Sequence, residues 1–475
     1  QEGDFRWAEL PDAGYVVEGR YPRDRHRQPF FVLRNNATGE HFIGQLAWSG
    51  AYQFRFDLDS PPATSDRAAS LAFRAGLHGP APQRTLAPGE TVGTPEMHLG
   101  MTFGGLDAAV QAMHEHLRHT VFMPQPRGRG SWVESGIGPE LEITEAQVWH
   151  AIECAAELGA EVFFIDASWY AKPHGNWWST VGHWQVDRQR FPKGLEPFRQ
   201  RVKARGMLWG LWMDAERIGT ECAVYQDHPE WRMRDYAGQE IGGMLDLTNP
   251  AAAAWMEEQI ARVIREYKLD FFRLDYNTHG CGRIERNGFV ENHFWRYYDA
   301  QYAVYDRLRA RFPKVIFENC AGGGGRSDIG MVRRFSHTWV TDWQIAPRSF
   351  MITNGMTLAL PPESVDRLLG GQSGHTAAEL DFQWRLLLFV RPTFGFLKPM
   401  GTDWNPLLLA RLQHWLALYK DFVRPFQSTS RIYHHTPVAA GPEPMGWGVL
   451  ELASADCTRS ICGLFQLGNP MQPEY

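Results

Sequence analysis

Short apolar runs alternate with amphipathic helical stretches from about residue 130 onward, and this alternation is the strongest constraint on the fold. The run 269–274 is typical, because it is mostly apolar, ends in Asp275 and lies between helical patterns at about 251–267 and 292–311. A short apolar strand between two helices predicts a βαβ unit, whose parallel strands are buried on both faces. Further candidate strands lie at 131–134, 161–166, 207–212, 315–318 and 338–342, with weaker ones near 356–360 and 393–397.

The number and alternation of these strands predict a (β/α)8 barrel of roughly 300 residues, at 123–430. A doubly wound sheet is the alternative, but such a sheet more often has a glycine-rich phosphate loop after its first strand, and the sequence has none there. Residues 1–122 show alternating and aromatic patches between turn clusters, which predicts an antiparallel β-sandwich. Strand patterns return in 431–475 and predict a small C-terminal antiparallel β-domain, which ends abruptly, as if the natural chain continued.

The composition favours some partners over others. A formal net charge of −6 and a pI near 6.3 give no reason to expect nucleic acid or an anionic membrane surface as a partner. No apolar run is long enough to span a membrane. Nineteen tryptophans and 13% aromatic residues are consistent with carbohydrate binding, although most tryptophans in proteins fill the core.

The six cysteines are scattered and include no C-x-x-C pair, so the sequence predicts neither a zinc site nor a disulfide framework. A reducing compartment fits this pattern best, and we therefore expect a cytoplasmic protein. Periplasmic or secreted locations are the alternatives, because the chain starts at Gln1 rather than at a methionine and an upstream segment could have been removed.

Acidic residues stand at or beside the ends of six successive candidate strands. The carboxyl ends of the strands meet at one face of such a barrel, where the chemistry of this fold is found. An acid at a strand end often caps the next helix or pairs with an arginine, but this ordinary role explains a single acid better than the whole set. The set is Glu134, Asp166, Asp214 with Glu216, Asp275, Glu318 and Asp342.

Three chemistries use a ring of acids. Metal-assisted hydrolysis needs ligands at fixed spacing, and the sequence contains neither H-x-H after the first strand nor H-E-x-x-H. Enolisation with Mg²⁺ needs a lysine or histidine base, and no suitable lysine ends a strand. Glycoside hydrolysis needs two carboxylates, about 5–5.5 Å apart for retention of configuration or about 6.5–9.5 Å apart for inversion. Tryptophans near the strand ends favour this last chemistry: Trp132, Trp169, Trp177, Trp178, Trp184, Trp212 and Trp343.

Four consecutive glycines, 322–325, follow the fifth candidate strand. Glycine allows backbone amides to approach a ligand closely. A nucleotide phosphate loop would need a G-K-[ST] ending and a longer run, so the segment favours a turn instead, either one that contacts a ligand or one without function.

Seven segments follow one another in a characteristic order: D-A-S-W-Y at 166–170, G-H-W-Q-V-D at 182–187, F-P-K-G-L at 191–195, G-L-W-M-D-A-E at 210–216, R-L-D-Y-N at 273–277, E-N-C-A-G-G-G-G-R at 318–326 and T-D at 341–342. In the same order they resemble the motifs D-D-G-W-F, G-D-W-x-x-D, x-P-x-G-L, G-L-W-F-E-P-E, K-W-D-M-N, E-S-C-S-G-G-G-G-R and S-D of glycoside hydrolase family 36, the α-galactosidases and α-N-acetylgalactosaminidases. The resemblance covers about residues 130–345 well and the N-terminal β-sandwich loosely.

The resemblance implies a retaining exo-acting α-glycosidase that acts on α-galactosides, with no metal and no organic cofactor. Asp275 is the implied nucleophile, which forms a glycosyl-enzyme ester. Asp342 is the implied acid, which protonates the leaving oxygen and then activates water as a base. Trp132 and Trp212 are candidate walls of the sugar subsite. The full set of predicted substrate-binding residues is Trp132, Asp166, Trp169, Trp212, Arg273, Asn277, Cys320, Gly322 and Trp343.

Three departures from the family pattern fall at positions that, by the resemblance, contact the sugar. Ala167 stands where the family usually has a second acid for O4 and O6, and Arg273 replaces a lysine, which is not a neutral exchange. Gly242 and Gly243 stand where family members commonly place an arginine. The alternatives to an α-galactoside are therefore α-N-acetylgalactosamine or another modified sugar, and a second hypothesis is a carbohydrate-binding or transglycosylating relative. The resemblance also suggests a homo-oligomer.

Overall fold

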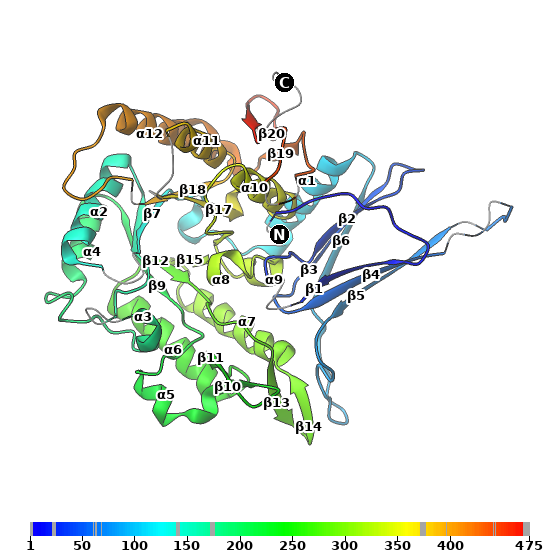
Figure 1. The fold of residues 1–475 in the computed structure, drawn as a ribbon, viewed down its shortest axis with the longest axis horizontal. Coiled ribbons are helices and arrows are strands. Elements are labelled where there is room, and N and C mark those ends of the chain that lie inside the picture. The colour runs from blue at the N-terminus through cyan, green and yellow to red at the C-terminus, as the bar shows by residue number, and fades with distance from the viewer. Residues whose placement is uncertain are drawn as a thin grey trace.

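A closed barrel of eight parallel strands lies at the centre of the computed structural model (Figure 1). The strands are β7 (Glu134–Ile137), β8 (Val162–Ile165), β9 (Leu208–Met213), β12 (Phe271–Leu274), β15 (Ile316–Asn319), β16 (His337–Trp339), β17 (Val365–Gly370) and β18 (Arg391–Gly395). They neighbour one another in chain order, and β18 pairs with β7 to close the ring. The predicted (β/α)8 barrel is confirmed. The structure describes residues 3–20, 25–59, 61, 64–67, 69–138, 143–171, 176–370, 377–395, 397–439, 441 and 443–468.

An apolar plug fills the amino-terminal end of the barrel. Val162, Phe164, Leu208, Phe271 and Ile316 form a separate buried cluster, and four of these five residues begin their strands. The rings of Phe164 and Phe271 stack with their centroids 5.2 Å apart. Because this end is closed by hydrocarbon, the polar groups of the barrel are left to its middle and to its carboxyl end.

Helices pack around the outside of the barrel, and α2 shows how the sequence specifies one. Thr144 and Gln147 form a capping box at its start, and Gly159 ends it in the left-handed conformation with a φ of 89°. Val148 and Ile152, four residues apart, are buried on the same face. The longer helices of the barrel region are α2 (Glu145–Leu158), α4 (Glu196–Ala204), α6 (Pro250–Glu266), α7 (Phe294–Arg311), α10 (Arg348–Ala359), α11 (Ala377–Leu387) and α12 (Pro406–Leu418).

Shorter elements lie between the strands and the longer helices. An antiparallel sheet with the order β11-β10-β13-β14 is inserted after β9 and β12. Its strands are β10 (Arg232–Asp235), β11 (Glu240–Leu245), β13 (Gly282–Arg286) and β14 (Phe289–Asn292). Short helices are α3 (Trp177–Thr180), α5 (Ala223–Asp227), α8 (Ala321–Gly324), α9 (Ile329–Val332) and α13 (Arg424–Gln427).

Two three-stranded antiparallel sheets form the N-terminal region, as predicted, with the orders β1-β4-β5 and β2-β3-β6. Phe31 of one sheet packs against Phe54 and Phe56 of the other, with ring centroids 5.4 and 5.0 Å apart. Figure 1 shows β4 and β5 extending away from the barrel. The elements are β1 (Tyr15–Gly19), β2 (Phe30–Arg34), β3 (His41–Leu46), β4 (Tyr52–Asp59), β5 (Ser70–Leu77), β6 (Met97–Thr102) and α1 (Leu106–His116), and at the C-terminal end an antiparallel sheet of β19 (Arg431–His434), β20 (Trp447–Ala453) and β21 (Ser460–Gln466).

Two of the predicted strands need correction. The stretch 356–360 is not the seventh strand, because residues up to Ala359 belong to α10, in which ten of twelve residues are buried. A helix buried on all sides resembles an apolar strand in sequence. The seventh strand is β17. Asp366 and Arg367 interrupt its apolar sequence pattern, although both side chains are buried within the barrel region. The first strand begins at Glu134 instead of ending there.

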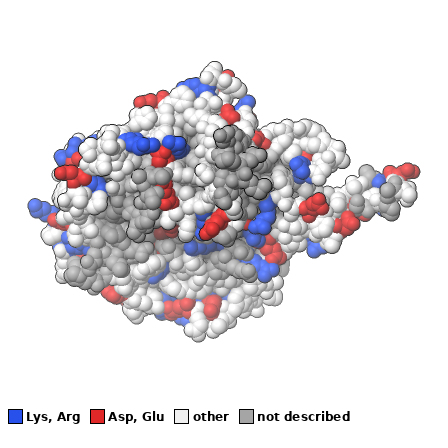
Figure 2. All heavy atoms as spheres, turned by 45° about the horizontal axis from the view of Figure 1, so that its top comes forward, with Lys and Arg blue, Asp and Glu red and all other residues white. Residues whose placement is uncertain are grey.

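The surface shown in Figure 2 carries basic and acidic residues interspersed with one another. Among the described residues, no helix has both the length and the apolar character that crossing a bilayer requires.

Candidate active site

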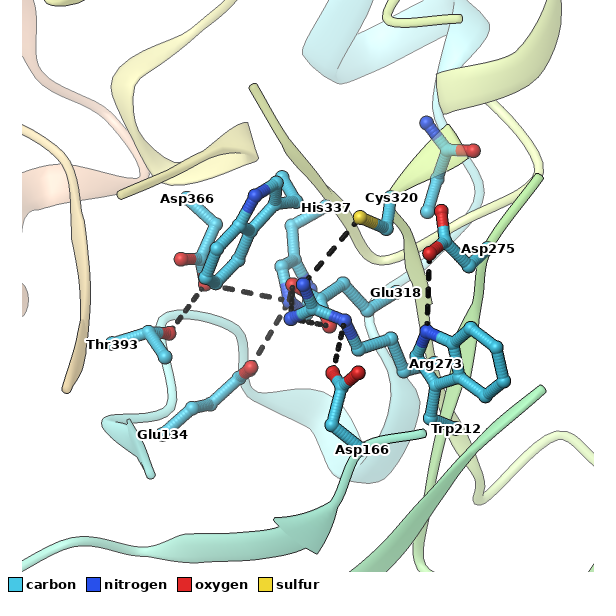
Figure 3. Close-up of polar contacts among 12 residues, drawn as sticks. Glu134, Asp166, Trp212, Arg273, Asp275, Glu318, Cys320, His337, Asp366 and Thr393 are labelled. Carbon is cyan, nitrogen blue, oxygen red and sulfur yellow. Dashed lines mark hydrogen bonds and ion pairs between the residues drawn. The ribbon is translucent and has the colours of Figure 1, made fainter. Parts of the chain in front are cut away.

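Asp275 follows β12 at the carboxyl end of the barrel, and four N–H groups hold its carboxylate, among them the indole N–H of Trp212 (Figure 3). Oδ1 accepts hydrogen bonds from the backbone N–H groups of Tyr276 and Gly322, at 2.9 and 2.5 Å. Oδ2 accepts from Asn277 Nδ2 at 2.8 Å and from Trp212 Nε1 at 3.2 Å. The residue is 8% exposed. A carboxylate can accept all four bonds, so the orientation of the Asp275 side chain is fixed.

The glycine run brings a second carboxylate to the same place. Gly322 and Gly323 adopt positive φ angles of 63° and 72°, which glycine tolerates and other residues rarely adopt. Gly322 donates to Asp275, and a β-carbon at Gly323 would lie 2.5 Å from Asp342 Oδ2. The glycine run, which belongs to α8 but has non-helical backbone angles at these two glycines, therefore lies directly against both acids.

Asp342 follows β16 and is exposed at the mouth of the barrel. Its Oδ1 accepts a hydrogen bond from Trp339 Nε1 at 2.9 Å. The Trp339 ring in turn lies against the guanidinium of Arg273, whose central carbon is 3.9 Å from the ring centroid. Trp339 thus fixes the acid and packs on the cation in the barrel at the same time.

Arg273 occupies the interior just below Asp275, with 5% of its side chain exposed (Figure 3). Its Nε is 3.3 Å from Asp166 Oδ2, its NH1 is 3.1 Å from Glu318 Oε2, and its NH2 is 3.4 Å from Cys320 Sγ. Burial raises the pKa of Asp166 to about 6, although Arg273 opposes the shift. Burial also raises the pKa of the Cys320 thiol well above its usual value. The structure thus brings Asp166, Arg273 and Cys320 together beneath Asp275.

Asp214 is a further member of the site that the predicted set lacks. It follows β9, is fully buried, and its Oδ2 is 3.4 Å from Asn277 Nδ2, the same amide that bonds to Asp275. Burial, and next the negative charge of Asp275, raise the pKa of Asp214 to about 7. Its place at a strand end was the available sequence signal, but its neighbours were not visible from the sequence.

Arg25 also reaches the site, from the connection between β1 and β2. Its NH1 contacts the ring of His279, and a β-carbon at Gly322 would lie 2.9 Å from this nitrogen. No sequence signal identified Arg25, because 254 positions separate it from its partner His279.

The tryptophans predicted to contact sugar lie in different places. Trp212 touches Asp275 through its Nε1. Trp169 is fully buried behind it and donates to the backbone oxygen of Trp212 at 2.8 Å, so it supports Trp212 from within the core. Trp343 is 42% exposed beside Asp342, with Arg348 stacked 4.6 Å from its ring centroid.

Trp132 lies at the opposite end of the barrel, and its predicted role as a wall of the sugar subsite is corrected by this position. It precedes β7 and packs against the apolar plug at the amino-terminal end. Arg129 covers its ring, 3.8 Å from the centroid, and the indole N–H donates to the Arg129 backbone oxygen at 3.0 Å.

Two acids predicted to stand at strand ends are instead part of a buried layer inside the barrel. Glu134, Glu318, His337 and Asp366 are fully buried, and one potential ligand atom from each lies within 4.8 Å of the others, a metal-like spacing. Burial raises the pKa of Glu134 to about 7 and that of Asp366 to about 6.

Arginines already neutralise these carboxylates. Arg391 NH2 lies 2.6 Å from Glu134 Oε1, and Arg273 pairs with Glu318. His337 Nε2 is 3.1 Å from the same Glu134 oxygen. Because arginines already pair with Glu134 and Glu318, this layer fits an ion-pair network that supports the site better than a metal centre.

Comparison with known proteins identifies similar chains. Residues 91–427 match the family model described as melibiase. Alpha-galactosidase 2 of Pediococcus pentosaceus is 27% identical over 450 residues, which are 92% of this chain and 60% of that protein. The alpha-galactosidase of Escherichia coli is 28% identical over 409 residues, 84% of this chain and 55% of that protein. The chain thus spans less than two thirds of the length of these relatives.

A solved structure shares the fold. The crystal structure of a variant of the GH36 alpha-galactosidase AgaA from Geobacillus stearothermophilus, in complex with raffinose, superimposes with a TM-score of 0.85 at 23% identity. The similarity covers 98% of this chain and 65% of that one.

Proposed function

Because the chain belongs to the melibiase family, glycoside hydrolase family 36, we propose that it is a retaining exo-α-glycosidase that releases terminal α-linked galactose from oligosaccharides or glycoconjugates. The names of the relatives from Pediococcus pentosaceus and Escherichia coli, both α-galactosidases, support galactose as the sugar. The raffinose complex of the Geobacillus enzyme supports an oligosaccharide as the substrate.

The contact of two carboxylates with successive glycines is the observation that carries the proposal. Asp275 accepts the N–H of Gly322, and Asp342 lies against the α-carbon of Gly323. Both acids therefore border the same glycine run. Retention over inversion is what the family motifs at 273–277 and 341–342 imply, with one aspartate as nucleophile and the other as acid and base.

In the first step, the Asp275 carboxylate attacks the anomeric carbon of the sugar. The bond between that carbon and the leaving oxygen breaks, and the leaving oxygen takes the proton of Asp342. The products are a β-linked glycosyl ester on Asp275 and the free alcohol. The N–H of Gly322 and the indole N–H of Trp212 orient the attacking group before reaction, so little reorganisation is needed in the transition state.

In the second step, Asp342 acts as a base and takes a proton from water. The water oxygen attacks the anomeric carbon, and the bond to Asp275 breaks to release the sugar with its original α configuration. Asp342 is exposed, so the leaving alcohol can depart and water can replace it beside this group. Trp339 holds one carboxylate oxygen of Asp342 during both steps.

The first experiment measures release of nitrophenol from aryl α-glycosides of galactose, N-acetylgalactosamine, galactosamine and glucose. We expect the α-galactoside to react fastest, and proton NMR to show α-galactose as the first product. A β product formed first would contradict retention. Fastest reaction of an amino sugar would instead assign the modified-sugar specificity that Ala167 allows.

Asp275→Ala should lower the rate by at least about a thousandfold, because the ester can no longer form. Added azide should then restore turnover and give the β-galactosyl azide. Asp299→Ala is the matched control: Asp299 lies on α7, its side chain is 50% exposed, and it pairs with Arg84. Wild-type activity in Asp275→Ala would place the nucleophile elsewhere, and tight sugar binding without turnover by the wild type would support a binding protein.

A further inference from the structure

Arg217 occupies the place beside Gly242 and Gly243 where members of the family commonly carry an arginine. The segment after β9 runs alongside the end of β11, with an antiparallel bridge between Arg217 and Met244. Arg217 Nε donates to the Gly242 backbone oxygen at 2.9 Å, and its NH2 donates to the Trp178 backbone oxygen at 3.0 Å. Two backbone oxygens therefore fix the direction of the guanidinium.

The backbone at Gly243 cannot carry a side chain in this structure. Its φ is +76°, and a β-carbon there would lie 2.1 Å from the backbone oxygen of Ile218 and 3.7 Å from Arg217 Cγ. The second distance shows that the Arg217 side chain passes over the position from which a side chain at 243 would start. The Arg217 side chain, from the segment after β9, thus occupies the space beside Gly243, where members of the family place an arginine.

The remaining nitrogen of Arg217 points toward Asp214. NH1 is 3.8 Å from Asp214 Oδ2, too far for a hydrogen bond, and it makes no hydrogen bond to any described residue. Asp214 Oδ1 is likewise buried without a hydrogen-bond partner among the described residues. The Arg217 side chain is 12% exposed and that of Asp214 is fully buried. A donor and an acceptor are therefore both unsatisfied, side by side.

These two groups lie next to the nucleophile. Asn277 Nδ2 links Asp214 Oδ2, at 3.4 Å, to Asp275 Oδ2, at 2.8 Å. The planar face of the Arg217 guanidinium is covered by Trp178, with its central carbon 4.5 Å from the ring centroid. The cation cannot swing away without losing this stacking and both backbone bonds.

We propose that Arg217 and Asp214 together bind one hydroxyl group of the sugar and that this pair determines specificity. A hydroxyl is both an acceptor and a donor, so it can accept from Arg217 NH1 and donate to Asp214 Oδ1 at once. Such a hydroxyl would give each of the two atoms the hydrogen-bond partner that it lacks among the described residues. A sugar without that hydroxyl leaves both buried groups unpaired, and this weakens binding of that sugar in the transition state. The inference rests on the proposed function, whose sugar-binding site it completes.

The test combines a side-chain change with removal of substrate hydroxyls. Arg217→Met keeps the length and apolar stem of the side chain but removes the guanidinium. It should lower kcat/KM for the aryl α-galactoside by about 10- to 100-fold, as expected for loss of a charged hydrogen bond. Arg217→Lys, which keeps the charge without the planar fork, should lose less.

The deciding measurement uses the aryl 2-, 3-, 4- and 6-deoxy-α-galactosides with both proteins. In the wild type, loss of the bound hydroxyl lowers kcat/KM. In Arg217→Met, loss of that same hydroxyl should cost at least about tenfold less, while the other three deoxy substrates lose the same factor in both proteins. Equal losses at all four positions in both proteins would overturn the proposal, because Arg217 would then contact no hydroxyl.

A control separates this result from damage to the fold. Arg232→Met changes an arginine of β10 whose side chain is 13% exposed and pairs with Glu240, and it should leave all kcat/KM values unchanged. Binding of free galactose, measured by calorimetry, distinguishes the two proposals. Binding that weakens at least about tenfold in Arg217→Met, without turnover by the wild type, would support the pair and refute the hydrolase. Absence of both galactose binding and turnover in the wild type would refute both.

Discussion

Glu216 and Arg326 form an ion pair in which neither side chain is exposed. Arg326 NH2 donates to Glu216 Oε1 at 2.8 Å and NH1 donates to Oε2 at 3.0 Å. Tyr297 and Gln301 of α7 also donate to the Glu216 carboxylate, at 2.5 and 2.8 Å. The pair ties the segment after β9 to the end of the glycine run, and these two segments carry Asp214 and the donor to Asp275.

Arg326→Met should destabilise the fold by about 3–5 kcal/mol, because it leaves the Glu216 carboxylate buried without its cation. Denaturant unfolding measures the loss. Adding Glu216→Gln to the same chain should recover part of it, since the uncompensated charge is gone. The exposed pair Arg265–Glu258 on α6 is the control, and Arg265→Met should cost less than about 1 kcal/mol. Equal costs for both arginines would contradict the importance of burial here.

Asp342→Asn should affect substrates according to how much their leaving groups need a proton. An aryl α-galactoside with a strongly acidic phenol needs no acid, so its first step should stay within about tenfold of wild type, whereas an alkyl α-galactoside should lose at least about a thousandfold. Azide should accelerate the second step, where Asp342 serves as base. Steady-state rates across a series of phenols would show this as a steeper dependence on leaving-group pKa. An unchanged dependence would remove Asp342 from the acid role.

Gly323→Ala should abolish most activity while the protein still folds. The added methyl would lie 2.5 Å from Asp342 Oδ2 and must displace the acid. Gly39→Ala is a matched control, because Gly39 has a similar φ of +78° but open space around its α-carbon. Both changes impose the same backbone strain, about 1–2 kcal/mol, yet only Gly323→Ala should lose activity. Thermal unfolding and nitrophenol release measure the two effects, and equal activities would contradict the placement of Asp342.

The raised pKa of Asp214 predicts that the free energy of unfolding falls as the pH rises toward 7. Its pKa is raised to about 7 in the folded protein, so the folded state binds this proton more tightly than the unfolded state does. Its favourable contribution is therefore complete below about pH 4 and disappears as the pH rises through 7. Asp214→Asn should flatten the decline in unfolding free energy between pH 4 and 7 by up to about 4 kcal/mol. Unfolding free energies of wild type and Asp214→Asn that differ by a constant amount from pH 4 to 7 would contradict the raised pKa of Asp214.

Asp456 provides a control, because its pKa is shifted in the opposite direction to that of Asp214. Hydrogen bonds from Ser454 and Thr458 lower the pKa of its carboxyl to about 2. Its stabilising effect is present above about pH 4 and is lost as the pH falls through 2. The difference in stability between Asp456→Asn and wild type should therefore narrow on acidification.

Much of the barrel was predictable because its strands are apolar and short. The first six strands and the eighth lie within a few residues of the predicted positions. The seventh could not be predicted from an apolar pattern, because Asp366 faces a buried ion network and pairs with Thr393 at 2.9 Å. Charged residues that are paired inside a barrel look like surface residues in sequence, and the fully buried helix α10 looks like a strand.

The sequence by itself determined the alternation of strands and helices, the order of the family motifs, and the placement of Asp275 and Asp342 after strands of one parallel sheet. Only the tertiary structure decided which acids meet there. Glu134 and Glu318 lie inside the barrel because strand register, set by pairing between distant segments, assigns each side chain its depth and face. The same pairing sends Trp132 to the closed end and brings Arg217 over Gly243. Contacts between segments far apart in the chain leave no local pattern, so the sequence alone does not reveal them.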